Sequence, residues 1–100
     1  MVDLARSRFE PGRVVATPAA LRAINAAGQS PLQFVNRHVS GDWGVLSPTE
    51  RALNTEAVKD GSRIMSAYVI AGDRRIWVIT DAANDHGQRA GTTILLPEEY

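Results

Sequence analysis

Three hydroxyl-proline pairs constrain the fold of this chain more than any other feature of its sequence. The pairs are Thr17-Pro18, Ser30-Pro31 and Ser47-Pro48. Serine and threonine cap the amino ends of helices and proline is favoured at the first helical position, so each pair predicts a helix start. Gln33 and Glu50 complete the reciprocal capping pattern behind two of them. We therefore expect helices over residues 18–27, 31–38 and 48–60.

The spacing of apolar residues assigns an inward face to each expected helix. The inward residues are Leu21 and Ile24, then Leu32, Val35 and Val39 with Phe34 beside them, and finally Leu53, Ala57 and Val58. The outer face of the third helix carries Arg51, Asn54, Glu56 and Lys59. Gly28 and Gly61 stand where a left-handed residue ends the first and third helices.

After Gly61 the sequence pattern changes from helix to strand. Residues 63–70, 74–80 and 92–97 are rich in branched and aromatic side chains, as strands are. Residues 13–16 form a further short strand candidate at a sheet edge. We therefore expect an α+β fold in which three N-terminal helices pack on one face of a three- to four-stranded antiparallel sheet, a C-terminal meander.

The size of the chain fits one domain over residues 1–100, with residues 1–12 expected as a loose N-terminal arm. Its apolar stretches are too short to span a bilayer, and charged residues interrupt any secretory pattern after Met1, so a cytoplasmic location is expected. The absence of cysteine excludes disulfides, thiolate metal sites and thiol nucleophiles.

Charge balance bears on the class of partner. Eleven basic residues match eleven acidic ones, whereas proteins that bind nucleic acid through phosphates usually carry a basic excess. A protein partner is therefore favoured over nucleic acid, and no membrane partner or cofactor is expected. No metal site is expected either, because His38 and His86 stand far apart without a ligand spacing such as HxH.

Residues 37–44 gather a cation, an imidazole, a carboxylate and an indole in one short run. In a functional interpretation His38 is a general acid-base group that Asp42 orients. In a structural interpretation the segment turns the chain out of a helix while Trp43 seals one end of the core. The structural interpretation is the favoured one.

One enzymatic hypothesis is metal-free RNA cleavage, which needs a base, an acid and a cation for the phosphate. The candidate catalytic residues are His38, Arg63 and Thr93, with Tyr68 and Thr80 presented to the same cleft. The order of helices followed by a meander resembles the small toxin nucleases of the barnase–colicin–RelE type. Those toxins are often basic, and this chain is neutral.

The competing hypothesis is protein binding. Its candidate binding residues are Arg37, His38, Asp42, Trp43 and Tyr100, of types favoured at interface centres. Trp77 lies within an apolar strand and is expected to fill the core. The connection over residues 81–91 is long for a hairpin, which is typical either of loop decoration or of a working surface.

Four motifs are spread over nearly the whole chain: residues 12–18 (GRVVATP), residues 38–44 (HVSGDWG), residues 76–80 (IWVIT) and residues 92–100 (TTILLPEEY). They resemble an uncharacterised family of small proteins of bacterial chromosomes, plasmids and phages. The resemblance implies a bacterial protein encoded near mobile DNA, with no assigned activity. The expected function is that of a non-enzymatic accessory or inhibitor protein of a mobile element, with inhibition of a restriction or CRISPR complex as one form.

Overall fold

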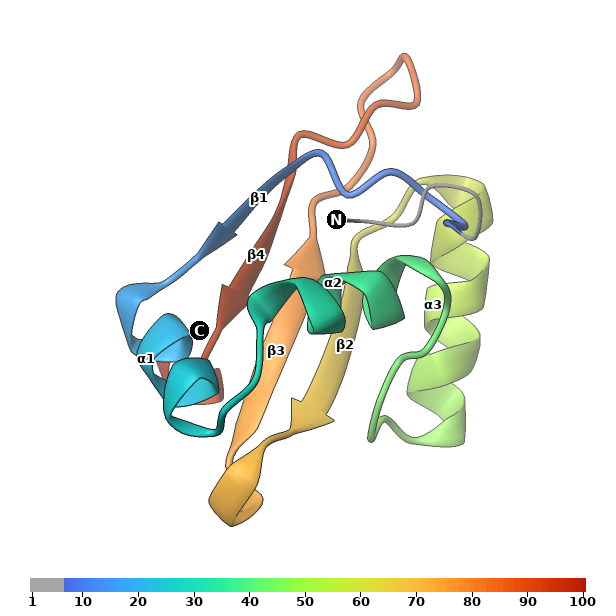
Figure 1. Ribbon diagram of the computed structural model, residues 1–100. Coiled ribbons are helices and arrows are strands. Elements are labelled where there is room, and N and C mark those ends of the chain that lie inside the picture. Colours follow the sequence, from blue (N-terminus) through green and yellow to red (C-terminus); the bar gives the residue numbers. More distant parts are fainter. Residues whose placement is uncertain (1–6) are drawn as a thin grey trace.

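A computed structural model describes residues 7–100 of the chain (Figure 1). The elements follow in the order β1 (Arg13–Ala16), α1 (Pro18–Ala26), α2 (Pro31–Val39), α3 (Pro48–Asp60), β2 (Ile64–Val69), β3 (Arg75–Thr80) and β4 (Gly91–Leu95). Two short 3-10 turns, η1 (Ala71–Asp73) and η2 (Pro97–Glu99), follow β2 and β4. Every predicted helix and strand is present, with ends shifted by at most two residues.

The helix starts form as the hydroxyl-proline pairs predict. Thr17 accepts a hydrogen bond from the backbone of Ala20, and Ser30 and Ser47 each form a complete capping box. At the other end of α3, Gly61 adopts the left-handed conformation, with a φ of 84°. These features depend only on neighbouring residues, which is why the sequence predicts them well.

The strand arrangement corrects the expected antiparallel sheet. The order in the sheet is β1-β4-β3-β2, and β1 pairs with β4 in parallel, from Arg13 opposite Gly91 to Ala16 opposite Ile94. Only β2, β3 and β4 form the antiparallel meander. The sheet is mixed because all three helices lie between β1 and β2, and such a long connection lets β1 run in the same direction as β4.

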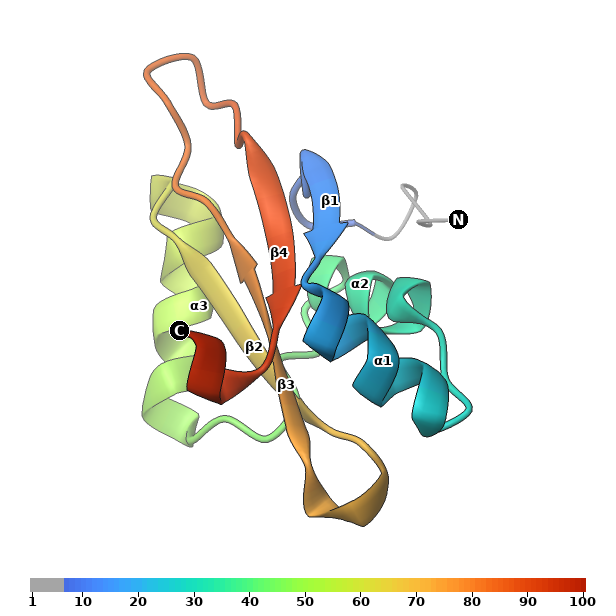
Figure 2. The same cartoon turned by 90° about the vertical axis from the view of Figure 1, so that its left-hand side faces the viewer.

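The helices also do not form one layer. Figure 2 shows α1 and α2 on one side of the sheet, with α3 and η2 on the other. We call the side under α1 and α2 the front face, where the large core includes Phe34, Tyr68 and Ile76. Helix α3 lies along the outer edge of β2 and buries little, because only Asn54 and Ala57 in it are buried.

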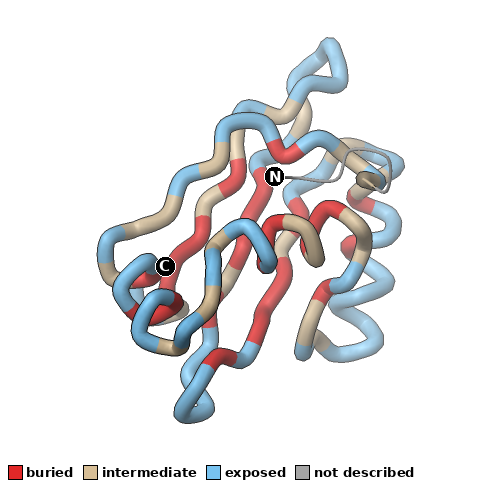
Figure 3. The backbone as a smooth tube through the Cα atoms, in the orientation of Figure 1, coloured by how far each residue is buried: buried red, intermediate tan, exposed pale blue. Residues whose placement is uncertain are grey.

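The opposite side of the sheet is the back face. Alternation along the strands places Met65, Trp77, Ile79, Thr93 and Leu95 there. Trp77 is half-buried instead of filling the main core as expected. Figure 3 shows the buried residues concentrated along the strands and on the sides of α1 and α2 that face them.

Three leucines that were expected to face the core lie on the surface instead. Leu21, Leu32 and Leu53 are exposed, the last to 65%. Asn54, expected on the solvated side of α3, is instead only 5% exposed. The exchange has a physical cause: α3 lies beside a strand edge, whose backbone groups need a polar partner more than an apolar one.

Asn54 acts as that partner by imitating a neighbouring strand. Its side-chain amide donates to the carbonyl of Met65 at 2.7 Å, and its oxygen accepts from the Met65 amide at 3.2 Å. Asn54→Asp removes the donor and sets a carboxylate against the carbonyl, so we expect a loss of about 2 kcal/mol in the free energy of unfolding. Urea denaturation measures it. Asn25→Asp, at an exposed helical position, is the control and should change stability by less than about 0.5 kcal/mol; equal effects would contradict the role.

The predicted loose arm is wrong for residues 7–12. The Arg8 amide donates to the carbonyl of Val39 at 2.7 Å, and the ring of Phe9 stacks on Trp43 with 6.2 Å between centroids. Pro11 is buried. The arm packs because Phe9 supplies apolar surface to the second, smaller core cluster. Residues 1–6 of the expected arm lie outside the described residues. Within residues 7–100, no helix has the length and apolar character to cross a membrane.

Candidate functional site

His38 is the most chemically versatile side chain of the site, and it is fully buried. Its Nδ1 lies 2.6 Å from the hydroxyl of Ser66, and its Nε2 lies 2.8 Å from that of Thr80. Thr80 in turn lies 2.6 Å from the hydroxyl of Thr92, which donates to the carbonyl of Pro11 at 2.7 Å. We call these five residues the buried polar chain. It connects α2, three strands and the arm.

Three of the four hydrogen-bond directions in the buried polar chain follow from its last member. A carbonyl can only accept, so the single hydroxyl hydrogen of Thr92 goes to Pro11. Thr80 must then donate to Thr92, and the Nε2–H of His38 must donate to Thr80. These hydrogen bonds place a proton on Nε2 of His38.

Electrostatics favour a neutral imidazole, in which Ser66 donates to an unprotonated Nδ1. Burial, followed by the positive charge of Arg89, lowers the pKa of His38 to about 3. An imidazole of this pKa does not exchange protons near neutral pH, which a general acid-base group must do. In residues 7–100 no buried side-chain nitrogen or oxygen lacks a hydrogen-bond partner, so the polar chain has no unmet demand that a ligand would satisfy.

Trp43 closes the site from the other side. It is only 5% exposed, and His38 meets its ring edge-on at 6.0 Å between centroids. Phe9 contacts the same imidazole edge-on at 5.2 Å. The imidazole is thus enclosed by two aromatic rings and two hydroxyls, and it has no open path to a substrate.

Arg37 and Asp42 form an ion pair at the rim of this corner. The Nε of Arg37 lies 2.6 Å from a carboxylate oxygen of Asp42, and this hydrogen bond lowers the pKa of Asp42. The same carboxylate accepts from the amide of Gly44, and the Asp42 carbonyl accepts from the hydroxyl of Tyr68. Asp42 therefore shapes the turn and does not orient His38.

The candidate catalytic residues do not converge. His38, Thr80 and Tyr68 lie on the front face, whereas Thr93 is on the back face because it alternates with Thr92. Arg63 also lies on the back side, with its guanidinium 5.5 Å from the ring centroid of Tyr100. The sheet thus separates the proposed base from the proposed cation.

The candidate binding residues are divided in the same way. Arg37 and Asp42 are partly exposed near the front corner, while His38 and Trp43 are buried beneath them. Tyr100 is 64% exposed and lies on the back face against Trp77, with 5.5 Å between ring centroids. The structure therefore brings four of the five together around the corner, and only two of those four reach solvent.

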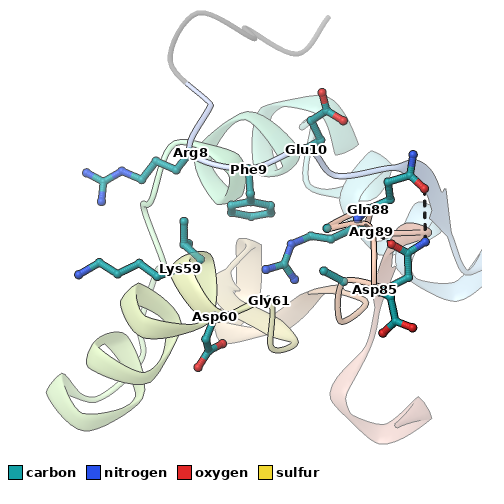
Figure 4. A pocket seen from close by; sticks show the side chains of 13 residues that line it. Arg8, Phe9, Glu10, Lys59, Asp60, Gly61, Asp85, Gln88 and Arg89 are labelled. Carbon is teal, nitrogen blue, oxygen red and sulfur yellow. Dashed lines mark hydrogen bonds between the residues drawn. The ribbon is translucent and has the colours of Figure 1, made fainter.

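A hollow of about 510 Å³ opens between the arm, the end of α3 and the 81–91 connection (Figure 4). Its lining includes three basic residues, Arg8, Lys59 and Arg89, and three acidic ones, Glu10, Asp60 and Asp85. This balance gives it no preference for an anion or a cation. Across residues 7–100, no group of three or more histidine, aspartate or glutamate side chains is arranged to hold a metal.

Arg89 is the structural centre of this hollow. Its guanidinium donates to the carbonyls of Ala57, Ser62 and Asp81 at 2.8–3.0 Å. It thereby caps the last turn of α3 and ties the 81–91 connection to it. Within the connection, the side chain of Asn84 accepts from the amides of His86 and Gln88, so the segment is a built hairpin extension.

Arg89→Lys should release this connection, because one ammonium cannot reproduce the planar fork that bonds three carbonyls. We expect amide hydrogen exchange at Ala83, which bonds to Gly61, to accelerate by about tenfold or more, the equivalent of about 1.4 kcal/mol. Arg74→Lys, at an exposed position in the η1 hairpin, is the control. Unchanged exchange in Arg89→Lys would contradict the anchoring role.

Two features of the site were not predicted from the sequence. Thr80 was expected near His38 only as part of a catalytic cleft, and Ser66 and Thr92 were missed, although all three stand at inward positions of their strands among branched apolar residues. Such hydroxyls are a usable signal, since buried polar groups require partners. The role of Arg89 left no local signal, because its partners are backbone carbonyls distant in sequence.

The geometry defines a small mixed α+β domain with a sealed polar centre and one partly open sheet face. Comparison with known proteins finds no matching family model, no matching curated protein and no matching solved structure.

Proposed function

We propose that this protein acts by binding another protein through its back face. The observation that carries the proposal is a cluster of three side chains, Trp77, Tyr100 and Arg63, which we call the back-face cluster. Trp77 is half-buried, Tyr100 leans edge-on against it, and the guanidinium of Arg63 lies over the tyrosine ring.

The composition of the back-face cluster supports a binding role. Tryptophan, tyrosine and arginine are the types that contribute most to binding at interface centres. The strands beneath add Met65, which is also partly exposed and whose flexible side chain adapts to partner surfaces. The back face is only partly covered: α3 and η2 lie on this side (Figure 2), and Ile79 and Leu95 are buried, but Met65 and Trp77 stay partly exposed to a partner.

The sealed corner supports a non-enzymatic role. His38 is neutral, enclosed and fully hydrogen-bonded, and the sheet separates it from Arg63 and Thr93. No observation favours the ribonuclease alternative, which needs these groups within reach of one phosphate.

The biological setting of the proposal comes from the motif resemblance. An accessory or inhibitor protein of a bacterial mobile element, acting on a restriction or CRISPR complex, needs a compact binding surface and no chemistry. Tyr100 belongs to the motif of residues 92–100, and Trp77 belongs to that of residues 76–80. The proposed binding surface therefore lies within the segments that carry the resemblance.

Affinity capture from a bacterial host, followed by mass spectrometry and direct titration of the captured protein, tests this proposal. Tyr100→Asp should weaken binding at least about tenfold, as loss of a central aromatic does. Leu32→Asp, which changes an exposed leucine of α2 on the opposite side, is the control and should bind as the wild type does. Equal binding by both variants would contradict the proposed surface. RNA cleavage by the wild type but not by His38→Ala would contradict the non-enzymatic role.

A further inference from the structure

The two edges of the sheet differ in how far their outward backbone groups are hydrogen-bonded. On the β2 edge, Asn54 bonds both backbone groups of Met65. Ala67 is bonded on the same edge, donating to the carbonyl of Trp43 at 3.2 Å and accepting from the amide of Val45 at 2.8 Å. This edge is closed, as native proteins close edges against unwanted pairing.

Among residues 7–100, no such cover lies on the β1 edge. The amides of Arg13 and Thr17 donate to the carbonyls of Ala90 and Ile94, so the odd residues of β1 direct their backbone groups toward β4. Val14 and Ala16 therefore direct theirs outward. Within residues 7–100, nothing else hydrogen-bonds to the backbone of these two residues. Figure 2 shows β1 on the side of the sheet that faces the viewer.

We propose that this edge pairs with the same edge of a second copy of the chain, so that two sheets join into one. The proposal does not depend on the proposed function. A twofold axis through Val15 pairs Val14 with Ala16 of the second copy and Ala16 with its Val14. In this antiparallel register, the outward amides and carbonyls of Val14 and Ala16 are all hydrogen-bonded in both copies.

Side chains favour this self-pairing over an unrelated strand. Arg13 would lie opposite Thr17 of the second copy, whose hydroxyl already donates to Glu99 at 2.7 Å. Glu99 uses one carboxylate oxygen, Oε1, for both Thr17 and the amide of Leu96. Arg22 of the same chain already acts on this carboxylate electrostatically, and Arg13 of the second copy would add a further cation beside Oε2. The twofold axis makes two such Arg13–Glu99 contacts, so the charges of the edge complement themselves.

A cysteine at the axis tests the register directly. The chain has no cysteine of its own, and Val15 would face Val15 of the second copy at the close spacing of a non-hydrogen-bonded pair, which suits a disulfide. Val69 in the closed edge strand β2 is equally exposed, at 43%, and is the matched control. On mild oxidation Val15→Cys should form a covalent dimer at least about tenfold faster than Val69→Cys.

The oligomeric state of the wild type gives the second arm. Sedimentation analysis over a dilution series should show a species of twice 10.8 kDa. Val14→Pro, which removes an outward amide and also trims a side chain packed on the core, and Arg13→Glu, which leaves the core untouched, should each yield the monomer, while Arg74→Glu keeps the dimer. Equal cross-linking rates of the two cysteine variants, a monomeric wild type at every concentration, or a dimer retained in both edge variants would each overturn the proposal.

Discussion

Gly44→Ala should unfold this protein or leave it only marginally stable. Gly44 has a φ of 76°, and a Cβ there would overlap the carbonyl oxygen of Ala67, with which it forms a parallel bridge. A backbone oxygen cannot move aside as a flexible side chain can. We expect a loss of more than about 4 kcal/mol, a large share of the stability of a domain of this size.

Gly72→Ala is the matched control for this prediction. Gly72 has nearly the same φ, 74°, but a Cβ there meets nothing within 4 Å. Its cost should be only that of the left-handed conformation, about 1–2 kcal/mol. Urea unfolding of both variants measures the difference. Similar urea midpoints for Gly44→Ala and Gly72→Ala would contradict the close approach of Gly44 to the backbone of β2.

His38→Ala is expected to cost about 3–5 kcal/mol of unfolding free energy. The substitution leaves a cavity in the core and deprives the hydroxyls of Ser66 and Thr80 of their partner. His86→Ala, at an exposed loop position, should change stability by less than about 0.5 kcal/mol. Thermal and urea unfolding measure both variants. A His38→Ala protein as stable as the wild type would contradict the stabilising role of the buried polar chain.

His38 also predicts how stability depends on pH. Its folded pKa of about 3 lies below the ordinary value of about 6.5, so between these pH values the unfolded state binds a proton that the folded state does not. Stability should therefore fall as the pH drops below about 6.5, by at most about 1.4 kcal/mol per pH unit. His38→Leu should remove this slope above about pH 5, where carboxylates have not yet begun to contribute. A slope kept in His38→Leu would contradict this assignment.

Local chemistry explains which parts of the fold the sequence predicts. The three helix starts depend on capping between residues at most three apart, and all three form. The parallel pairing of β1 with β4 joins segments about 80 residues apart, and no local pattern reports such a contact. Leu53 was predicted to be buried and Asn54 exposed, and the structure shows the opposite. Hydrophobic periodicity considers only apolar residues, whereas the backbone at the edge of β2 needs the amide of Asn54 as its partner.

The candidate site shows the same contrast between local features, which the sequence predicts, and long-range contacts, which it does not. The favoured structural interpretation of residues 37–44 required only that turns and indoles have common uses, and the enclosed Trp43 agrees with it. The failure of His38, Arg63 and Thr93 to converge depends on strand alternation, which places Thr92 inward and Thr93 outward. That inference was accessible from the sequence once the strands were assigned. The capping of α3 by Arg89 was not, because its partners are carbonyls.

His38 is a neutral, buried group whose hydrogen bonds join α2, the sheet and the arm. Nitrogen-15 NMR tests this neutral state most directly, in a His86→Gln background so that every imidazole signal belongs to His38. We expect an Nε2-protonated tautomer whose signals stay unchanged from neutral pH down to about pH 4.5, since the pKa of His38 is about 3. Protonation of His38 with a midpoint near its ordinary value of about 6.5 would contradict it.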